Sequence, residues 1–280
     1  MFLKGCALSC WWCHNPESQA PGPELLLHPS RCIRCGACVE ACGRGAARLE
    51  DDGPAADREV CRDCDEFACA TVCVAEARQI AGRRMTVTQV LDVAARDEPF
   101  YRDGGGVTLS GGEPMLQPDF TAGLLAALKA RGIHTALDTC GHTSWEALDR
   151  IRRDVDLFLY DVKLMDEERH RRFTGVSNRR ILANLRALAD GGQRILLRVP
   201  VVPGINDDDE NVRALAGLAA GLPGLDGVEL LPYHRIGADK YVRLDRKYRL
   251  LTTDAPSRAR LDAIADVLAA SGVRVGRGGT

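Results

Sequence analysis

The sequence predicts an α/β fold built on a parallel sheet, either a barrel or a doubly wound sheet. From Thr86 onward, strand signals alternate with helical apolar spacing, which is typical of successive βαβ units. With the apolar lead Phe2–Gly5 there are six such units, too few for a closed eight-stranded barrel. Residues that could form a binding or catalytic site follow these strands: Cys6, Gly111–Glu113, Asp138, Asp161–Lys163, Arg198 and His234. Because the carboxyl ends of parallel strands meet at one edge, a shared site there is favoured over six unrelated loop residues.

Periodicity and turn residues place the individual elements. Strands are expected at Gly106–Ser110, His134–Asp138, Leu157–Lys163, Ile195–Pro200 and Val228–Tyr233. Helices are expected where apolar faces begin, at Val87, Phe120, Ile181 and Leu261. Two further helix starts are predicted from capping signals, Thr143 with Glu146 and Asp207 with Glu210.

Size, charge and cysteine usage narrow the class of protein. A chain of 280 residues can hold one α/β barrel and a small appended module. The formal net charge of −2 provides no basic field, so nucleic acid is not an expected partner. No apolar run could span a bilayer, and Met1–Lys4 is no signal peptide, so no membrane association is expected. Twelve cysteines then indicate a reducing cytoplasm, metal binding rather than disulfides, and sensitivity to oxygen.

The segment Gly5–Glu17 concentrates the chemistry at the start of the chain. Its cysteines, Cys6, Cys10 and Cys13, are spaced C-x3-C-x2-C. Three thiolates on one tight loop can ligate three irons of a 4Fe–4S cluster and leave the fourth iron open to a substrate. The alternatives are a structural zinc loop or disulfides. Zinc would need a fourth ligand, and His14 beside Cys13 is poorly placed to provide it.

A cysteine-rich module, residues 29–82, interrupts the α/β pattern. Its first quartet reads C-x2-C-x2-C-x3-C and comprises Cys32, Cys35, Cys38 and Cys42. The second reads C-x2-C-x4-C-x3-C and comprises Cys61, Cys64, Cys69 and Cys73. The first spacing is that of two-cluster bacterial ferredoxins, in which the fourth cysteine of each motif ligates the other cluster. Two 4Fe–4S clusters are therefore the expectation, with two structural zinc ions as the alternative.

Several segments together resemble one family. The C-x3-C-x2-C loop resembles the radical S-adenosylmethionine (SAM) superfamily, and SGGEP, DVK, VPGIND and LPYH follow in the order found in activating enzymes of glycyl radical enzymes. The chain resembles the branch of these activases that carries a ferredoxin-like insert, over nearly its whole length. This resemblance implies a partial (β/α)6 TIM-like barrel formed by residues 1–28 and 83–280, with the insert at 29–82.

The resemblance also implies the cofactors. Cys6, Cys10 and Cys13 would hold the SAM-cleaving 4Fe–4S cluster, whose open iron chelates the methionine part of SAM. The insert would hold two auxiliary clusters, which makes three in all. In the ferredoxin arrangement, Cys73 would join the first three cysteines of the first quartet, and Cys42 those of the second. Reductive cleavage of SAM would release a 5′-deoxyadenosyl radical.

Site residues are implied motif by motif. Gly111 and Gly112 would let the backbone approach closely, and Glu113 would pair with the methionine ammonium. Lys163, counted with the three loop cysteines as catalytic, and Arg198 would contact the carboxylate or ribose oxygens of SAM, unless they form barrel ion pairs. The other cofactor-binding residues implied are Trp12, Cys13, His14, Asp138, Asp161, Val162 and His234. The two aspartates would place a monovalent cation beside the SAM carboxylate.

Residues outside these motifs are assigned ordinary roles. Trp11 is expected to pack in its loop, and Cys140 to be a buried thiol. The histidines without a motif are expected at the surface or in loops: His28, His134, His142 and His170.

The predicted function is hydrogen abstraction from a glycine of a partner glycyl radical enzyme. A flavodoxin or ferredoxin-type protein is the expected electron donor. One alternative is a radical SAM maturase that acts on another polypeptide or a small molecule. Another is a three-cluster electron carrier, which would leave the SGGEP and DVK loops unexplained.

The N-terminus departs from the family. Its members carry a preceding segment with an Asp-Gly-Pro-Gly turn and the first half of strand one, whereas Met1 here stands four residues before Gly5. Either the start was placed late, or the first strand is short and the cysteine loop is loosened. An upstream in-frame segment, if restored, is then expected to raise cluster occupancy.

Overall fold

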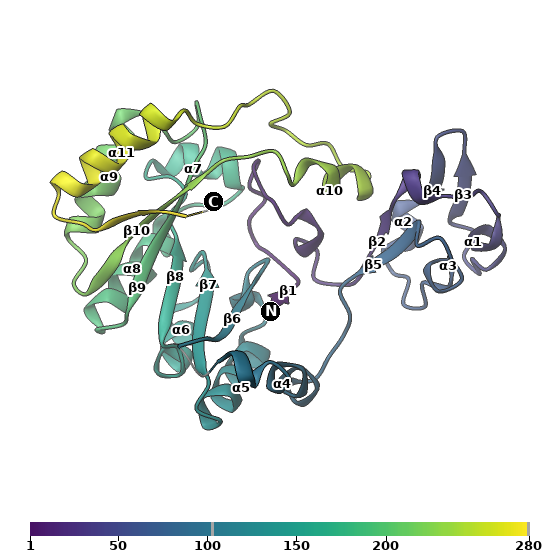
Figure 1. The fold of residues 1–280 in the computed structure, drawn as a ribbon, viewed down its shortest axis with the longest axis horizontal. Helices are drawn as coiled ribbons and strands as arrows, with labels where there is room; N and C mark the ends of the chain where they lie inside the picture. The colour runs from purple at the N-terminus through teal and green to yellow at the C-terminus, as the bar shows by residue number, and fades with distance from the viewer. Residues whose placement is uncertain (102–103, 279–280) are drawn as a thin grey trace.

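The computed structural model describes residues 1–101 and 104–278, which form a curved parallel sheet and a small module beside it (Figure 1). Every neighbouring pair of strands in this sheet is parallel, in the order β1-β6-β7-β8-β9-β10-β11. The strands are β1 (Phe2–Leu3), β6 (Gly106–Gly111), β7 (His134–Thr139), β8 (Leu157–Asp161), β9 (Ile195–Val201), β10 (Leu225–Pro232) and β11 (Val275–Arg277).

The strand count differs from the prediction by one. The six predicted strands are present, and β11 adds a seventh by pairing with β10, Val228 opposite Val275. This three-residue strand is largely exposed, so it carries neither alternation nor an apolar run from which it could be predicted. β1 has only two residues, and its pairing to β6 is extended by Ser110 N–H donating to the Met1 carbonyl at 2.8 Å.

Helices cover the convex face of the sheet, as Figure 1 shows for α5, α6, α8, α9 and α11. The helices of this part are α4 (Val87–Ala95), α5 (Pro118–Ala130), α6 (Trp145–Ile151), α7 (Glu167–Thr174), α8 (Arg179–Asp190), α9 (Asp209–Ala220), α10 (Ala238–Arg243) and α11 (Arg258–Ala270). Between sheet and helices lies one apolar core, which includes the fully buried Leu109, Leu137, Phe158 and Leu197. None of the helices among the described residues has the length and apolar character that crossing a membrane requires.

Two predicted helix starts are corrected by one residue each. Ser144, not Thr143, caps α6 by accepting the N–H of Ala147, and Asp208, not Asp207, caps α9 by accepting that of Asn211. In each case two capping-type residues stand side by side, and spacing alone does not choose between them. The predicted strand Leu157–Lys163 ends at Asp161, so Lys163 lies in the following loop.

The cysteine-rich module is built from two antiparallel pairs and three one-turn helices. β2 (Glu24–Leu27) pairs with β5 (Arg78–Ala81), and β3 (Ala47–Glu50) pairs with β4 (Gly53–Ala56). The helices are α1 (Ala37–Glu40), α2 (Arg58–Cys61) and α3 (Ala68–Thr71). Because β2 closes the module against β5, the module begins near Glu24, before the predicted boundary at residue 29. It has its own small core around Leu25, Leu27 and Phe67.

Candidate active site

A cavity of about 540 Å³ lies where the strands of the parallel sheet end. This volume is in the range of small-molecule binding sites. The predicted residues that line it are Cys6, Cys10, Trp12, Cys13, His14, Gly111, Gly112, Asp138, Asp161, Lys163, Arg198 and His234. The structure therefore brings together groups separated by more than 200 residues of sequence, as parallel strands require.

The cysteine loop is held on one side by the end of α7. The N–H of Ser9 donates to the Thr174 carbonyl at 2.7 Å, and that of Trp11 donates to the Phe173 carbonyl at 3.0 Å. Gly175, at φ +87°, approaches Ser9 so closely that a Cβ there would lie 2.7 Å from its hydroxyl oxygen. The sequence Phe173-Thr174-Gly175 therefore holds the cysteine loop in place.

The other side of the cysteine loop is held by α10 and the segment after it. Tyr241 donates from its hydroxyl to the Cys13 carbonyl at 3.1 Å. Lys240 donates to Glu17 at 2.6 Å, and Arg246 donates to the Pro16 carbonyl at 2.9 Å. These contacts fix the positions of the three thiols relative to β10 and the loop that follows it.

The glycine pair at the end of β6 allows close backbone contact, as predicted, with β1 and with the start of the cysteine loop. A Cβ on Gly111, at φ +124°, would lie 2.2 Å from the Leu3 carbonyl oxygen. A Cβ on Gly112 would lie 2.2 Å from the Gly5 carbonyl oxygen and 2.5 Å from that of Ser18. The N–H of Glu113 also donates to the Gly5 carbonyl at 2.7 Å. Only glycine allows β6 to approach the loop at this distance.

Two ion pairs lie among the residues that line the cavity. Arg198 lies 2.8 Å from Asp138, which also accepts the Ser110 hydroxyl at 2.7 Å. Lys163 lies 2.8 Å from Asp161. Burial raises the pKa of the Asp138 carboxyl, and the neighbouring Asp161 charge raises it further. Burial opposes the charge on Lys163, yet the Asp161 carboxylate and the nearby thiols raise the pKa of Lys163 well above its usual value.

Glu113 is held by hydrogen bonds from its own chain. Its carboxylate is buried and does not line the cavity. Oε1 accepts the Thr139 hydroxyl at 2.7 Å and the Met115 N–H at 3.0 Å, and Oε2 accepts the Cys140 N–H at 2.8 Å. With both oxygens engaged by its own chain, Glu113 joins the ends of β6 and β7.

Val162 contributes its side chain to the core and its backbone to the sheet. Its side chain is buried in the main core and does not line the cavity, while its N–H donates to the Arg198 carbonyl at 3.0 Å. Its sequence position between Asp161 and Lys163 puts the side chain on the opposite face of the strand end.

Aromatic residues and histidines form one wall. The rings of His14 and His234 stack with centroids 4.1 Å apart, and a His14 ring nitrogen is 2.9 Å from the His234 carbonyl. Trp12 is buried and lines the cavity, whereas Trp11 packs outside it, edge-on to Phe173. The packing role predicted for Trp11 is therefore observed.

One of the histidines assigned to the surface or to loops is in a helix and buried instead. His170 is 1% exposed within α7, and its Nδ1 lies 2.7 Å from the Val176 carbonyl. His28 lies in a loop, as predicted, although its side chain is buried. Cys140, as predicted, is a buried thiol.

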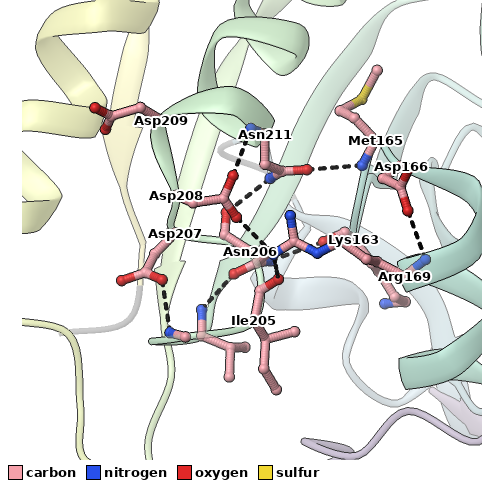
Figure 2. Close-up of polar contacts among 12 residues, drawn as sticks. Lys163, Met165, Asp166, Arg169, Ile205, Asn206, Asp207, Asp208, Asp209 and Asn211 are labelled. Atoms are coloured by element: carbon pink, nitrogen blue, oxygen red, sulfur yellow. Dashed lines mark hydrogen bonds and ion pairs between the residues drawn. The ribbon is translucent and has the colours of Figure 1, made fainter.

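A buried amide network positions the Lys163 loop (Figure 2). Asn206 donates to the carbonyls of Lys163, at 2.8 Å, and Pro200, and accepts the Val202 N–H at 2.7 Å. Asn211 accepts the Met165 N–H at 2.9 Å and donates to the Asn206 carbonyl at 2.8 Å. The segment VPGIND (202–207) thus supports the loop DVK (161–163) through the hydrogen bond from Asn206 to the Lys163 carbonyl. The sequence of this segment predicted a helix start at Asp207 but did not predict that Asn206 supports the Lys163 loop.

The same network includes charged residues that face away from the cavity. Arg169 donates to the Ile205 carbonyl and to Asp208, both at 2.7 Å, which ties α7 to the start of α9 (Figure 2). Asp207 accepts the Gly204 N–H at 2.7 Å and stabilises the turn.

Several residues that line the cavity were not predicted as site residues, among them Gln19, Ser110 and Glu229. Glu229 of β10 lines the cavity, and Gly278 packs directly over its carboxylate. Glu229 is in the middle of a predicted strand, where alternation marks it only as facing away from the core. Its inward position follows from the curvature of the sheet.

The three loop thiols converge on the cavity in a desolvated setting. Burial raises the pKa of Cys6 to about 11 and that of Cys10 to about 12. Among the described residues, no three His, Cys, Asp or Glu side chains are grouped as ligands of one metal ion. Thiols arranged around a wide cavity fit a multi-iron cluster better than a single zinc ion.

The insert contains two further cavities lined by cysteines. One is lined by Cys32, Cys35, Cys38 and Cys73, and the other by Cys42, Cys61, Cys64 and Cys69. The fourth cysteine of each motif thus lies beside the first three cysteines of the other motif. This crossed grouping is typical of two-cluster ferredoxins. At Cys42, burial raises the thiol pKa, but the N–H groups of residues 44–47 outweigh it and the pKa is lowered.

Comparison with known proteins shows the superfamily of this chain. Residues 1–216 match the family model of the Radical SAM superfamily, to which the chain therefore belongs. It is 44% identical over 275 residues to the isethionate sulfite-lyase activating enzyme of Nitratidesulfovibrio vulgaris, covering 94% of this chain and 88% of that one. Within the superfamily, the chain belongs to the activating enzymes of glycyl radical enzymes.

Two further relatives extend this result. The chain is 40% identical over 286 residues to the trans-4-hydroxy-L-proline dehydratase activating enzyme of Clostridioides difficile, covering all of this chain and 93% of that one. The crystal structure of a domain of pyruvate-formate lyase-activating enzyme from Bacteroides vulgatus matches with a TM-score of 0.55 at 32% identity. That match covers 63% of this chain and all of the other, and it supports the partial barrel.

Proposed function

We propose that this chain cleaves SAM reductively in the 540 Å³ cavity and uses the resulting radical to abstract hydrogen from a glycine of a partner enzyme. One observation carries this proposal: three free thiols and two half-buried ion pairs face the same cavity. A 4Fe–4S cluster held by Cys6, Cys10 and Cys13 would supply the electron that cleaves the sulfonium to a 5′-deoxyadenosyl radical.

The chain's own groups would bind and orient SAM. Arg198 and Lys163 offer positive charge to its carboxylate, while Asp138 and Asp161 offer acceptors to its ammonium group. The adenine would pack beside Trp12 and the stacked pair of His14 and His234. The two aspartates would supply part of a monovalent-cation site, whose other ligands would come from SAM and water.

The radical itself is unselective, so selectivity must come from positioning. A sheet of seven strands with short outer strands leaves the barrel open at one side. A glycine loop of a separate protein can enter such an opening, and glycine has no side chain to obstruct approach to its Cα–H. The walls then keep water and other bonds away from the radical.

We also propose that the insert holds two 4Fe–4S clusters in the crossed arrangement of its thiols. The cavity at Cys42 measures about 250 Å³, whereas the one at Cys35 measures about 20 Å³. The exposed loop that carries Cys35 would therefore open outward on loading. Two clusters here would connect the barrel to a flavodoxin or ferredoxin-type donor.

The partner is proposed as a class. Relatives named for isethionate sulfite-lyase, trans-4-hydroxy-L-proline dehydratase and indoleacetate decarboxylase share 44%, 40% and 38% identity with this chain. These relatives support a glycyl radical enzyme as partner. Because the three identities are close to one another, they do not favour one member of that class.

The test is transfer of deuterium. The reconstituted chain is incubated with SAM, a reductant and a candidate partner that carries Cα-deuterated glycine. Deuterium is expected in 5′-deoxyadenosine, together with a glycyl radical signal in electron paramagnetic resonance (EPR). The matched control changes Cys6, Cys10 and Cys13 to Ala, which should abolish both readouts and leave the iron of the insert. Cleavage of SAM without transfer to any glycyl radical enzyme encoded in the same genome would refute the proposal.

A further inference from the structure

Arg78 opens strand β5, and its side chain lies between the two cysteine-lined cavities of the insert. It lines both of them. It is only 2% exposed and is the largest fully buried side chain among the described residues. A long cationic side chain buried to this extent requires a partner.

The protein satisfies only one nitrogen of this guanidinium. Nη2 donates to the Arg48 carbonyl at 2.9 Å and to the Ala55 carbonyl at 2.7 Å, which anchors Arg78 to the β3–β4 hairpin. Within residues 1–101 and 104–278, Nε and Nη1 are buried and have no acceptor, and no carboxylate forms an ion pair with Arg78.

A buried charge without a counter-charge is strongly unfavourable, so the anions must come from what the cavities hold. Each cavity is lined by four thiols. The positive charge of a 4Fe–4S core is smaller than the negative charge of its four thiolate ligands, so each loaded site is anionic. One guanidinium with two free N–H directions, placed between two such sites, matches this requirement.

We propose that Arg78 is the shared counter-charge and hydrogen-bond donor of both insert clusters, an inference that rests on the proposed presence of these clusters. It is a positioning residue and takes no part in the chemistry at SAM. A positive charge and N–H···S hydrogen bonds stabilise the reduced, more negative state of a cluster, so Arg78 raises both reduction potentials. The same contact favours assembly of both clusters.

The test compares three variants in a full-length background with Cys6, Cys10 and Cys13 changed to Ala, so that only insert clusters contribute. Arg78→Met removes the charge, and Arg78→Lys keeps it without the guanidinium fork. Arg48→Met is the matched control, because it removes one positive charge from an exposed side chain that lines neither cavity. The readouts are iron and sulfide content and a redox titration followed by EPR.

Both midpoint potentials are expected to fall together in Arg78→Met, well beyond any shift in Arg48→Met, and Arg78→Lys should restore part of the fall. If Arg78→Met does not load, loading of Arg78→Lys supports the charge role. Two clusters with unshifted potentials in Arg78→Met would overturn the inference. So would loss of iron in both Arg78→Met and Arg78→Lys, which would assign Arg78 only to holding the hairpin. A parent protein without insert iron would refute the cluster proposal itself, while SAM cleavage by the wild-type chain remains a separate measurement.

Discussion

The side-chain amide of Asn206 donates a hydrogen bond of 2.8 Å to the backbone carbonyl of Lys163. Through this bond a residue outside the cavity controls a loop whose lysine lines it. Asn206 also donates to the Pro200 carbonyl and accepts the Val202 N–H, and its side chain is 4% exposed. Removing it therefore leaves three buried backbone groups without a partner.

We expect Asn206→Ala to lower the free energy of unfolding by about 2–4 kcal/mol, because each orphaned buried group costs about 1–3 kcal/mol and part of this is relieved by water. SAM cleavage should fall as well, because the Lys163 loop loses its support. Denaturant unfolding and 5′-deoxyadenosine production measure the two effects. The near-isosteric Asn206→Asp keeps the acceptor for the Val202 N–H but loses both donors, so it should also lower stability and SAM cleavage. Wild-type stability in both variants would contradict the role assigned to this network.

Gly112→Ala is expected to displace the cysteine loop, because the new Cβ would lie 2.2 Å from the Gly5 carbonyl oxygen. Iron bound by the loop and SAM cleavage should both be lost in large part, while insert iron stays. The matched control is Gly217→Ala within α9, where nothing lies within 4 Å. That change should raise stability by about 0.5–1 kcal/mol, since alanine favours a helix. Equal iron and activity in the two variants would show that the close approach is unimportant.

His170 should make stability depend on pH. Burial lowers the pKa of His170 below its unfolded value of about 6.5, although its bond to the Val176 carbonyl opposes this. The unfolded chain then binds more protons in this window, so stability falls as the pH drops below about 6.5. Between about pH 7.5 and 5.5, the wild type should lose more stability than His170→Gln. The other histidines are common to both proteins and cancel in the comparison. Parallel pH profiles of the melting temperature would contradict this prediction.

The grouping of the insert cysteines predicts how iron is lost on double substitution. If Cys73 serves the first site, Cys32→Ala with Cys73→Ala removes one cluster, because both changes affect the same cavity. Cys61→Ala with Cys73→Ala removes two, because the changes affect different cavities. Iron and acid-labile sulfide per chain distinguish the cases. Loss of only one cluster in the Cys61 and Cys73 double variant would mean that each quartet closes on itself.

Local sequence determined the chemistry of this protein. Thiol spacing is read within a few residues, so the C-x3-C-x2-C loop and the two quartets were evident without a structure. The alternation of strands and helices is also local, and it indicated the parallel sheet and the edge where Asp138, Lys163 and Arg198 meet.

Tertiary structure decided what depends on contacts between distant residues. The orientation of Glu113 toward Thr139 and Cys140, the support of Lys163 by Asn206, and the seventh strand β11 each depend on a partner that spacing does not reveal. The inward position of Glu229 depends on the curvature of the sheet, and that of Arg78 on the packing of two cysteine motifs face to face. A side chain's type states what it can bind, but the fold decides which of its possible partners it meets.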